Sequence, residues 1–269
     1  MKLRVFAVGS LVLLAACGSD GDGAAPDGGG QEQTLVQNVV EVGLTEYAFG
    51  MPDDVTGGVV TFEFANKGSE PHEMGLVGIE GDRGLEDVMK AIEKGGFPPW
   101  AEDLSGIPAI SSGIETSMTR ELDEGTYAFM CFLPTPEGEP HVAQGMVSVF
   151  GVTGTSDADL PEPDLRIAVT DDGFEVPEIE AGTYTVELAN DGTKLHELAF
   201  ISFEPGKGEK DLGRWFNSGY EGEAPAVFPG GVKAIRPGSS VIVTLRFESG
   251  RTYTLEDFEN DLRTSIVVE

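Results

Sequence analysis

The chain has few of the residues that bind soft metals or nucleic acids. It contains two cysteines and three histidines in 269 residues, and its 17 basic residues face 47 acidic ones, for a net charge of -30. This excess of negative charge makes nucleic acid and anionic lipid surfaces poor partners. A basic partner protein would be attracted to it. A solvated acidic surface with no specific partner is the simpler alternative.

The N-terminus lacks an apolar run long enough to span a bilayer. A basic start precedes an apolar stretch at residues 5–16, which is the pattern of an export signal. The stretch ends in the letters LAAC at residues 14–17 and resembles a bacterial lipobox. The resemblance implies that residues 1–17 are a lipoprotein signal, cleaved before Cys17 and lipidated on its sulfur; a plain secretory cleavage site is the alternative. We therefore expect an exported, extracytoplasmic protein of the cell envelope, anchored to the membrane by lipid.

Removal of the signal leaves a tether and a single thiol. Residues 18–34 are rich in glycine and aspartate, with almost no large apolar side chains, and predict a flexible tether. A lipidated Cys17 leaves Cys131 without a disulfide partner. In an oxidising compartment an unpaired thiol is a liability unless it is buried or binds a metal. This favours a ligand role for Cys131, and a buried, inert cysteine stays open as the alternative.

The chain repeats itself. Residues 58–68 (GVVTFEFANKG) match residues 182–192 (GTYTVELANDG), and the letters HEM at 72–74 fall on HEL at 196–198. A nearly constant offset over a whole domain indicates duplication. The predicted division is a first domain at residues 35–151, a polar, proline-containing linker at 152–163 and a second domain at 164–269.

Both repeats alternate apolar and polar residues as β-strands do. Apolar residues occupy every second position at 60–64, 184–188 and 241–247. These runs lie between Gly, Asn and Pro turns and predict an all-β fold of two tandem antiparallel sandwiches. A short inserted helix is predicted in the first repeat, where Leu85, Val88, Met89 and Ile92 follow helical spacing and Gly95-Gly96 ends it.

The segment from Cys131 to Met146 carries the strongest chemical signal. Its sequence, CFLPTPEGEPHVAQGM, holds a thiol, the imidazole of His141 and a thioether, and His72 stands upstream. Two nitrogens and a thiolate in a trigonal plane, with a weak axial thioether, make the blue-copper electron-transfer site. Prolines at 134, 136 and 140 fix φ and stiffen the segment.

This order of residues resembles the cupredoxin family. An Asn-x-Gly motif at 66–68 precedes Pro-His at 71–72, and the C…H…M segment precedes the final strand of the first repeat. The resemblance covers both repeats as Greek-key sandwiches, and the first alone as a metal site. It implies one copper ion per chain, held by His72, Cys131, His141 and Met146. The spacing of the last two is that of plastocyanin, and the longer interval before His141 is close to that of copper nitrite reductase.

Taken singly, each candidate ligand has a structural alternative. Met146 is typical of a core, and His72 beside Glu73 is typical of a hydrogen-bonded structural histidine, as is His196 at the equivalent place. Their joint order and spacing favour copper. In the second repeat Asp257 falls where Cys131 stands, and no histidine or methionine follows. We expect that repeat to be a structural or docking domain without copper, whose deletion leaves the copper site unchanged unless the repeats share a wall of it.

Residues for the known catalytic copper centres are scarce. Multicopper oxidases and copper nitrite reductase need extra histidines, and His196 is the one left over. Met130 stands where nitrite reductase carries a histidine, and no G-x-S-x-G motif occurs. We therefore expect that the chain is not an enzyme.

The sequence thus predicts an exported, membrane-anchored type 1 copper protein that transfers single electrons to or from a redox partner. Two alternatives stay open. One is a non-redox, cupredoxin-like binding or scaffold lipoprotein without metal, and the other is a protein that holds or delivers copper.

The anchor can be tested by replacing its cysteine. We expect Cys17→Ala to abolish acylation and to leave the precursor uncleaved by the lipoprotein route, because the acceptor sulfur is gone. Intact-mass spectrometry of the membrane fraction measures both effects. A wild-type mature N-terminus without acyl mass would contradict the lipobox interpretation.

Overall fold

The computed structural model describes residues 37–94 and 98–269. The predicted signal at residues 1–17 with Cys17, the tether at 18–34 and the two glycines expected to end the first helix lie outside these residues. The described residues belong to one compact unit. Among the described residues, neither helix has the length and apolar character needed to cross a membrane.

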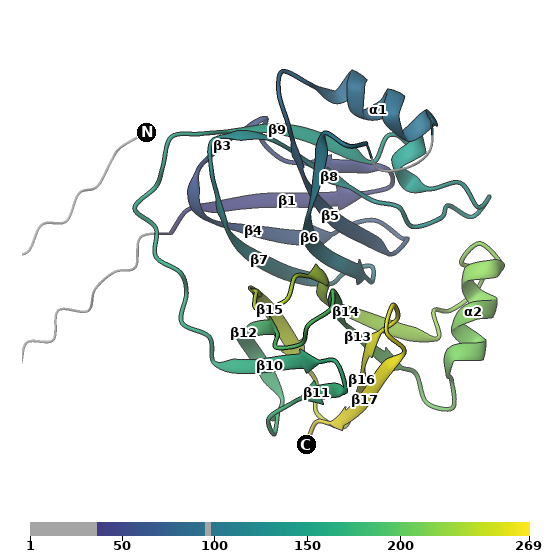
Figure 1. Cartoon of the computed structure of the whole chain (residues 1–269). Helices are drawn as coiled ribbons and strands as arrows, with labels where there is room; N and C mark the ends of the chain where they lie inside the picture. Colours follow the sequence, from purple (N-terminus) through teal and green to yellow (C-terminus); the bar gives the residue numbers. More distant parts are fainter. Residues whose placement is uncertain (1–36, 95–97) are drawn as a thin grey trace, which may run out of the picture. The chain divides into compact units, whose positions relative to one another are not determined.

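The first repeat is built almost entirely of strands (Figure 1). Its strands are β1 (Val39–Thr45), β2 (Ala48–Gly50), β3 (Asp54–Thr56), β4 (Gly58–Asn66), β5 (His72–Ile79), β6 (Ala101–Ile110), β7 (Glu115–Leu122), β8 (Gly125–Met130) and β9 (Val147–Thr153). Helix α1 (Leu85–Lys94) stands between β5 and β6, and the 3-10 turn η1 (His141–Gln144) precedes β9. The predicted helix is confirmed.

The second repeat follows the same order. Its elements are β10 (Leu165–Thr170), β11 (Gly173–Glu175), β12 (Gly182–Asn190), β13 (His196–Phe203), α2 (Glu209–Asn217), β14 (Ala226–Ile235), β15 (Ser240–Phe247), β16 (Thr252–Asp257) and β17 (Leu262–Val267). Helix α2 was not predicted, although Leu212, Trp215 and Phe216 have helical spacing. It occupies the same position in the second repeat, between β13 and β14, that α1 occupies in the first. The all-β fold class of two tandem sandwiches is confirmed.

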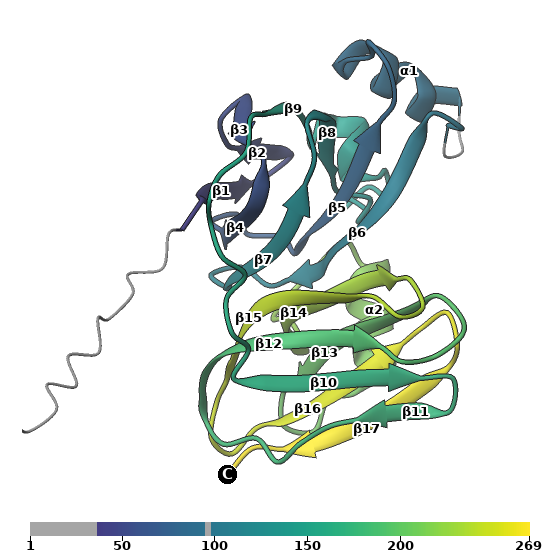
Figure 2. The same ribbon diagram turned by 60° about the vertical axis from the view of Figure 1, so that its left-hand side comes forward.

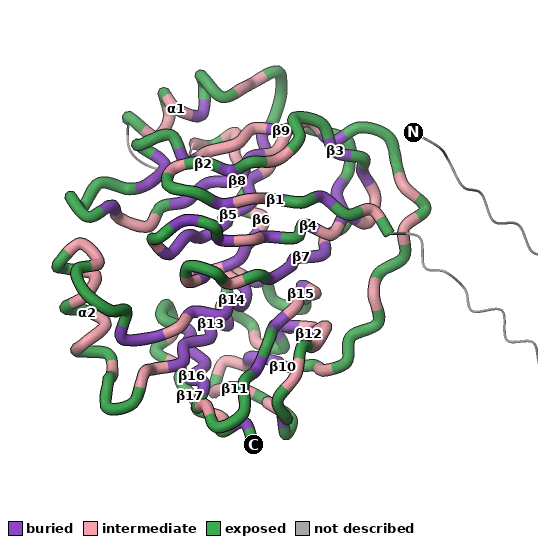
Figure 3. The backbone as a smooth tube through the Cα atoms, turned by 180° about the vertical axis from the view of Figure 1, so that it is seen from behind, coloured by how far each residue is buried: buried purple, intermediate pink, exposed green. Residues whose placement is uncertain are grey.

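Alternation along the strands builds the core. In β4, Val60, Phe62 and Phe64 are buried, whereas Glu63 between them is exposed. Burial follows the strands in Figure 3, and the turns between them are mostly exposed. Each apolar side chain removed from water in this way contributes about 1.5–3 kcal/mol to folding, so the alternation predicted from sequence also fixes which face of each strand points inward.

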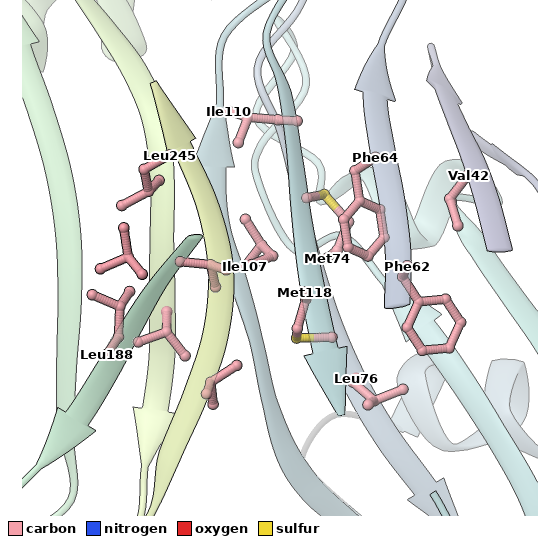
Figure 4. Packing of buried hydrophobic residues seen from close by; sticks show 14 of the residues in the cluster. Val42, Phe62, Phe64, Met74, Leu76, Ile107, Ile110, Met118, Leu188 and Leu245 are labelled. Atoms are coloured by element: carbon pink, nitrogen blue, oxygen red, sulfur yellow. The ribbon is translucent and has the colours of Figure 1, made fainter. Parts of the chain in front are cut away.

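Both sheets run through the two repeats (Figure 2). One has the order β11-β10-β12-β15-β7-β4-β1-β2, and the other has the order β17-β16-β13-β14-β6-β5-β8-β9-β3. The junctions are β7 with β15, where Met118 lies opposite Val243, and β6 with β14, where Gly106 lies opposite Lys233. Figure 4 shows Ile107 between Met118 of the first repeat and Leu245 of the second, within one continuous core.

Two equivalent glycines allow the backbone to approach closely beside these junctions. Gly106 in β6 has φ +158°, and a Cβ there would lie 2.1 Å from the carbonyl oxygen of Met74. Gly231 in β14 has φ +135°, and its Cβ would lie 2.0 Å from the carbonyl oxygen of Leu198. Both positions therefore require glycine, and each marks an irregular stretch of pairing with the neighbouring strand.

The shared sheets give a prediction for the isolated first repeat. We expect a chain that ends at Thr153 to lose most of its soluble monomer, because β6 and β7 become open edges and Ile107, Ile110 and Met118 lose their cover. Size-exclusion chromatography of the soluble fraction measures this. As a control, two fragments divided at Asp157 and produced together should elute as one complex. A soluble, monomeric first repeat would contradict the expectation.

Candidate metal centre

Three of the predicted ligands meet at one end of the first sandwich. His72 is the first residue of β5, and Cys131 directly follows β8. Because these strands are antiparallel, with Gly75 opposite Met130, the start of one lies beside the end of the other. His141 opens η1. The ligand atoms of His72, Cys131 and His141 all lie within 4.8 Å of one another, and the three side chains are fully buried.

The donor atoms face a common point. The Nδ1 atoms of the two histidines lie 3.2 Å apart, and Nδ1 of His141 lies 3.4 Å from Sγ of Cys131. Metal–nitrogen bonds are about 2.0 Å long, so two nitrogen ligands of one ion lie on the order of 3–3.5 Å apart. The spacing of the nitrogens in this chain therefore fits ligands that share a metal ion.

The Nε2 atoms of His72 and His141 lack hydrogen bonds. Among the described residues, Nε2 of His72 has no hydrogen-bond partner. Nε2 of His141 lies 3.0 Å from Oε2 of Glu70, but neither atom is satisfied because the pair lacks hydrogen-bond geometry. Buried polar atoms without partners are rare in folded proteins and need an explanation. A metal on the Nδ1 side would satisfy Nδ1 of both rings and would leave each Nε2 as an N–H group.

The long interval between Cys131 and His141 does not separate them. The intervening residues form a small hairpin, in which Pro134 and Pro140 make an isolated antiparallel bridge. The N–H of His141 donates to the carbonyl of Leu133 at 2.8 Å, which returns the chain to the cysteine. The long interval is therefore taken up by the hairpin, and His141 still lies beside Cys131.

Met146, the predicted axial ligand, is joined to Cys131 and His141 by backbone hydrogen bonds. The N–H of Cys131 donates to the carbonyl of Met146 at 3.2 Å, and the N–H of Met146 donates to the carbonyl of His141 at 3.0 Å. Its side chain is fully buried in the core cluster that contains Cys131. Gly145, with φ 104°, makes the turn between η1 and Met146 possible. The axial role stays a prediction.

Hydrogen bonds fix the backbone around the ligands. The N–H of Glu73 donates to Sγ of Cys131 at 3.4 Å, and a carboxylate oxygen of Glu73 accepts from the N–H of Phe132 at 2.9 Å. Asn66 donates to the carbonyl of Glu70 at 2.9 Å and so holds the turn that leads into β5. Sequence analysis did not assign Glu73 a function. The repeated His-Glu pair at 72–73 and 196–197 was the signal for it.

Burial sets the protonation of the donors. It lowers the pKa of His72 to about 4, with repulsion from His141 as a further cause, and it also lowers the pKa of His141. Burial raises the pKa of the Cys131 thiol to about 12. Without metal the cluster is therefore uncharged at neutral pH. An incoming cation must displace the thiol proton, as metal binding to cysteine requires.

The equivalent place in the second repeat has a different chemistry. Nδ1 of His196 lies 2.5 Å from Oδ2 of Asp257, and its Nε2 lies 3.0 Å from Oδ1 of Asp171. Hydrogen bonds from Thr193 and His196 hold the pKa of Asp171 below its usual range. Carboxylates thus satisfy both nitrogens of this buried ring. The aspartate at 257 was identified from sequence, whereas the contact with Asp171 was not.

No protein-family model and no curated protein matches the chain. Solved structures similar to it include copper proteins. Auracyanin from Roseiflexus castenholzii is 20% identical, with a TM-score of 0.29, and the match covers 44% of this chain and 98% of auracyanin. The blue copper oxidase from Nitrosomonas europaea is 15% identical, with a TM-score of 0.28 and coverage of 87% and 86%. The copper-containing nitrite reductase from Thermus scotoductus is 12% identical, with a TM-score of 0.23 and coverage of 86% and 61%.

The prediction that the chain is not an enzyme is wrong. The structures matched over most of the chain are multicopper oxidases and copper nitrite reductase, which are enzymes, although the similarity is distant. The prediction counted histidines in a single chain. A count within one chain does not exclude a catalytic copper centre whose ligands come from two chains, since oligomers can build sites at their interfaces.

The buried histidine gives the metal-free protein a pH dependence. Between pH 6.5 and about 4 the unfolded chain binds a proton that folded His72 does not, so protonation favours unfolding. We expect the free energy of unfolding to fall across this window as pH falls, more steeply than in His72→Gln. Urea titrations of both metal-free proteins at several pH values measure the difference. Parallel pH profiles would contradict the expectation.

Proposed function

We propose that the chain carries single electrons through a type 1 copper site in its first repeat. The observation that carries this proposal is the convergence of one thiol and two imidazole Nδ1 atoms, from His72, Cys131 and His141, at a buried end of the sandwich. Two nitrogens and one thiolate are the equatorial donors of blue copper. The second repeat offers two carboxylates to its histidine in place of a thiol, which supports one ion per chain.

The residues of the chain would hold the ion in a dry and fixed geometry. The lowered pKa values of His72 and His141 keep both imidazoles neutral near pH 7, so each Nδ1 can offer a lone pair. The hydrogen bond from the N–H of Glu73 stabilises negative charge on Sγ of Cys131. When bound, copper would supply a one-electron couple at this buried sulfur. A site closed to water and held by backbone hydrogen bonds changes little between two charge states.

The setting of the site is part of the proposal. The letters LAAC at residues 14–17 support an extracytoplasmic protein that a lipid on Cys17 anchors to the membrane. The net charge of -30 supports a redox partner with a basic docking face, because opposite charges speed the encounter of two proteins.

The first test is the copper spectrum. We expect Cu(II) to bind at one ion per chain with an intense visible thiolate band and the EPR signal of a type 1 site. Cys131→Ser should lose the band, because a hydroxyl is a poor donor to this ion. Met146→Leu should keep the band and raise the reduction potential, because a weak donor to Cu(II) is lost.

His196→Gln is the matched control, since it alters the equivalent histidine in the other repeat. Its spectrum and copper content should equal those of the wild type. A colourless wild-type protein that retains no copper after dialysis would refute the proposal. A protein that binds copper and shows no reversible one-electron couple would instead favour copper holding or delivery.

A further inference from the structure

A lysine of the second repeat reaches the metal centre of the first. Lys233 lies in β14, opposite Gly106 of β6, at the junction of the two repeats. Its Nζ lies 2.7 Å from Oε2 of Glu73. The glutamate side chain is 8% exposed and the lysine side chain 32%, so the pair is shielded from solvent more than a surface ion pair is.

Glu73 connects this lysine to the cysteine. The backbone N–H of Glu73 donates to Sγ of Cys131. Its second carboxylate oxygen, Oε1, accepts from the N–H of Phe132, the residue that follows Cys131. The carboxylate of Glu73 and the ammonium of Lys233 carry opposite charges, and these contacts connect both to the sulfur. Both charges therefore act on the sulfur, with opposite signs.

The contact breaks the symmetry of the duplication. Residues 101–110 of β6 align with residues 226–235 of β14, and these equivalent strands pair with each other. Lys233 stands where the first repeat has Pro108. Glu197, the counterpart of Glu73, accepts from the N–H of Phe258 at 2.9 Å in the same way. It forms no ion pair within the described parts of the chain, and burial raises its pKa. Within the described residues, Lys233 therefore forms its ion pair with the glutamate beside the cysteine, and it acts on Glu197 only through its charge at longer range.

A second contact joins the second repeat to the metal centre of the first. The hydroxyl of Tyr220, just after α2, donates to the carbonyl of Pro134 in the ligand hairpin. Gly219, with φ +73°, lies so close to Pro136 that a Cβ would come within 2.6 Å of the proline carbonyl oxygen. The second repeat therefore touches the hairpin as well as the strand that carries His72.

We propose that the second repeat tunes the copper site of the first: Lys233 sets the reduction potential of the copper through its ion pair with Glu73. This inference rests on the proposed function of the first repeat. Lys233 acts as a positioning residue: it neutralises the carboxylate beside the sulfur and holds it against the N–H of Phe132. A positive charge near the sulfur stabilises the more reduced, less positive ion, and an unpaired carboxylate stabilises the more oxidised one. The sequence led us to expect that deletion of this repeat leaves the site unchanged unless the two repeats share a wall of it, and the contacts of Lys233 and Tyr220 correspond to that exception.

The test is the midpoint potential of copper-loaded, full-length variants. We expect Lys233→Met to shift the ratio of Cu(I) to Cu(II) affinity about tenfold toward Cu(II), a fall of about 59 mV for a one-electron couple. Glu73→Gln should shift it in the opposite direction, because glutamine can still accept from Phe132 without the charge. The double variant should return close to the wild-type value, and Lys233→Arg should retain it.

Lys207→Met is the control, because it removes the same charge from an exposed position of the second repeat. Its potential should equal that of the wild type. Loss of packing alone would move both single variants in one direction. That result, or potentials that do not move at all, would overturn the inference while the proposed function stands.

A second measurement separates the two failures. A double-mutant cycle on the unfolding of the metal-free protein measures the coupling of Lys233 to Glu73 directly, and we expect it to be stabilising. If the wild type takes up no copper, the proposed function fails and the tuning role fails with it. A stabilising coupling in that case would reduce the pair to a structural contact.

Discussion

Antiparallel pairing between equivalent strands of a duplicated chain is the interaction on which the rest of this structure depends. A β-sandwich exposes unpaired N–H and C=O groups at its sheet edges, and an exposed edge invites aggregation. Here β6 and β7 of the first repeat are covered by β14 and β15 of the second. The pairing extends both sheets and makes the two cores one. It also places Lys233 of β14 so that its side chain reaches across β6 to Glu73, near the start of β5 where His72 lies.

The two repeats show two ways to bury a histidine on one scaffold. A buried imidazole needs partners for both nitrogens, because an unpaired polar group in the core costs several kcal/mol. His196 finds them in Asp171 and Asp257. Glu46, the counterpart of Asp171, accepts from the N–H of Glu70 at 3.3 Å, as Asp171 does from that of Lys194, but it has no hydrogen bond to His72. A thiol stands in place of the second carboxylate. The two arrangements differ by a few side chains.

Duplication also placed charge asymmetrically. The junction strands are related by the repeat, so identical sequences would give each glutamate the same neighbour. One lysine, at a position where the other strand has a proline, directs a positive charge to the glutamate beside the cysteine. The second repeat thus contacts the glutamate beside Cys131 as well as the hairpin that carries His141.

The sequence by itself determined the class of the fold, the duplication and the donor types of the site, because these follow from period-two alternation, a constant offset and the order of His72, Cys131 and His141. It missed α2, whose helical spacing is short and was outweighed by the surrounding strand pattern. The hairpin that returns His141 to Cys131, the orientation of both Nδ1 atoms and the contact of Lys233 with Glu73 were decided only by the tertiary structure. Each depends on backbone hydrogen bonds or strand pairings between residues far apart in the chain, and residue order alone does not specify them.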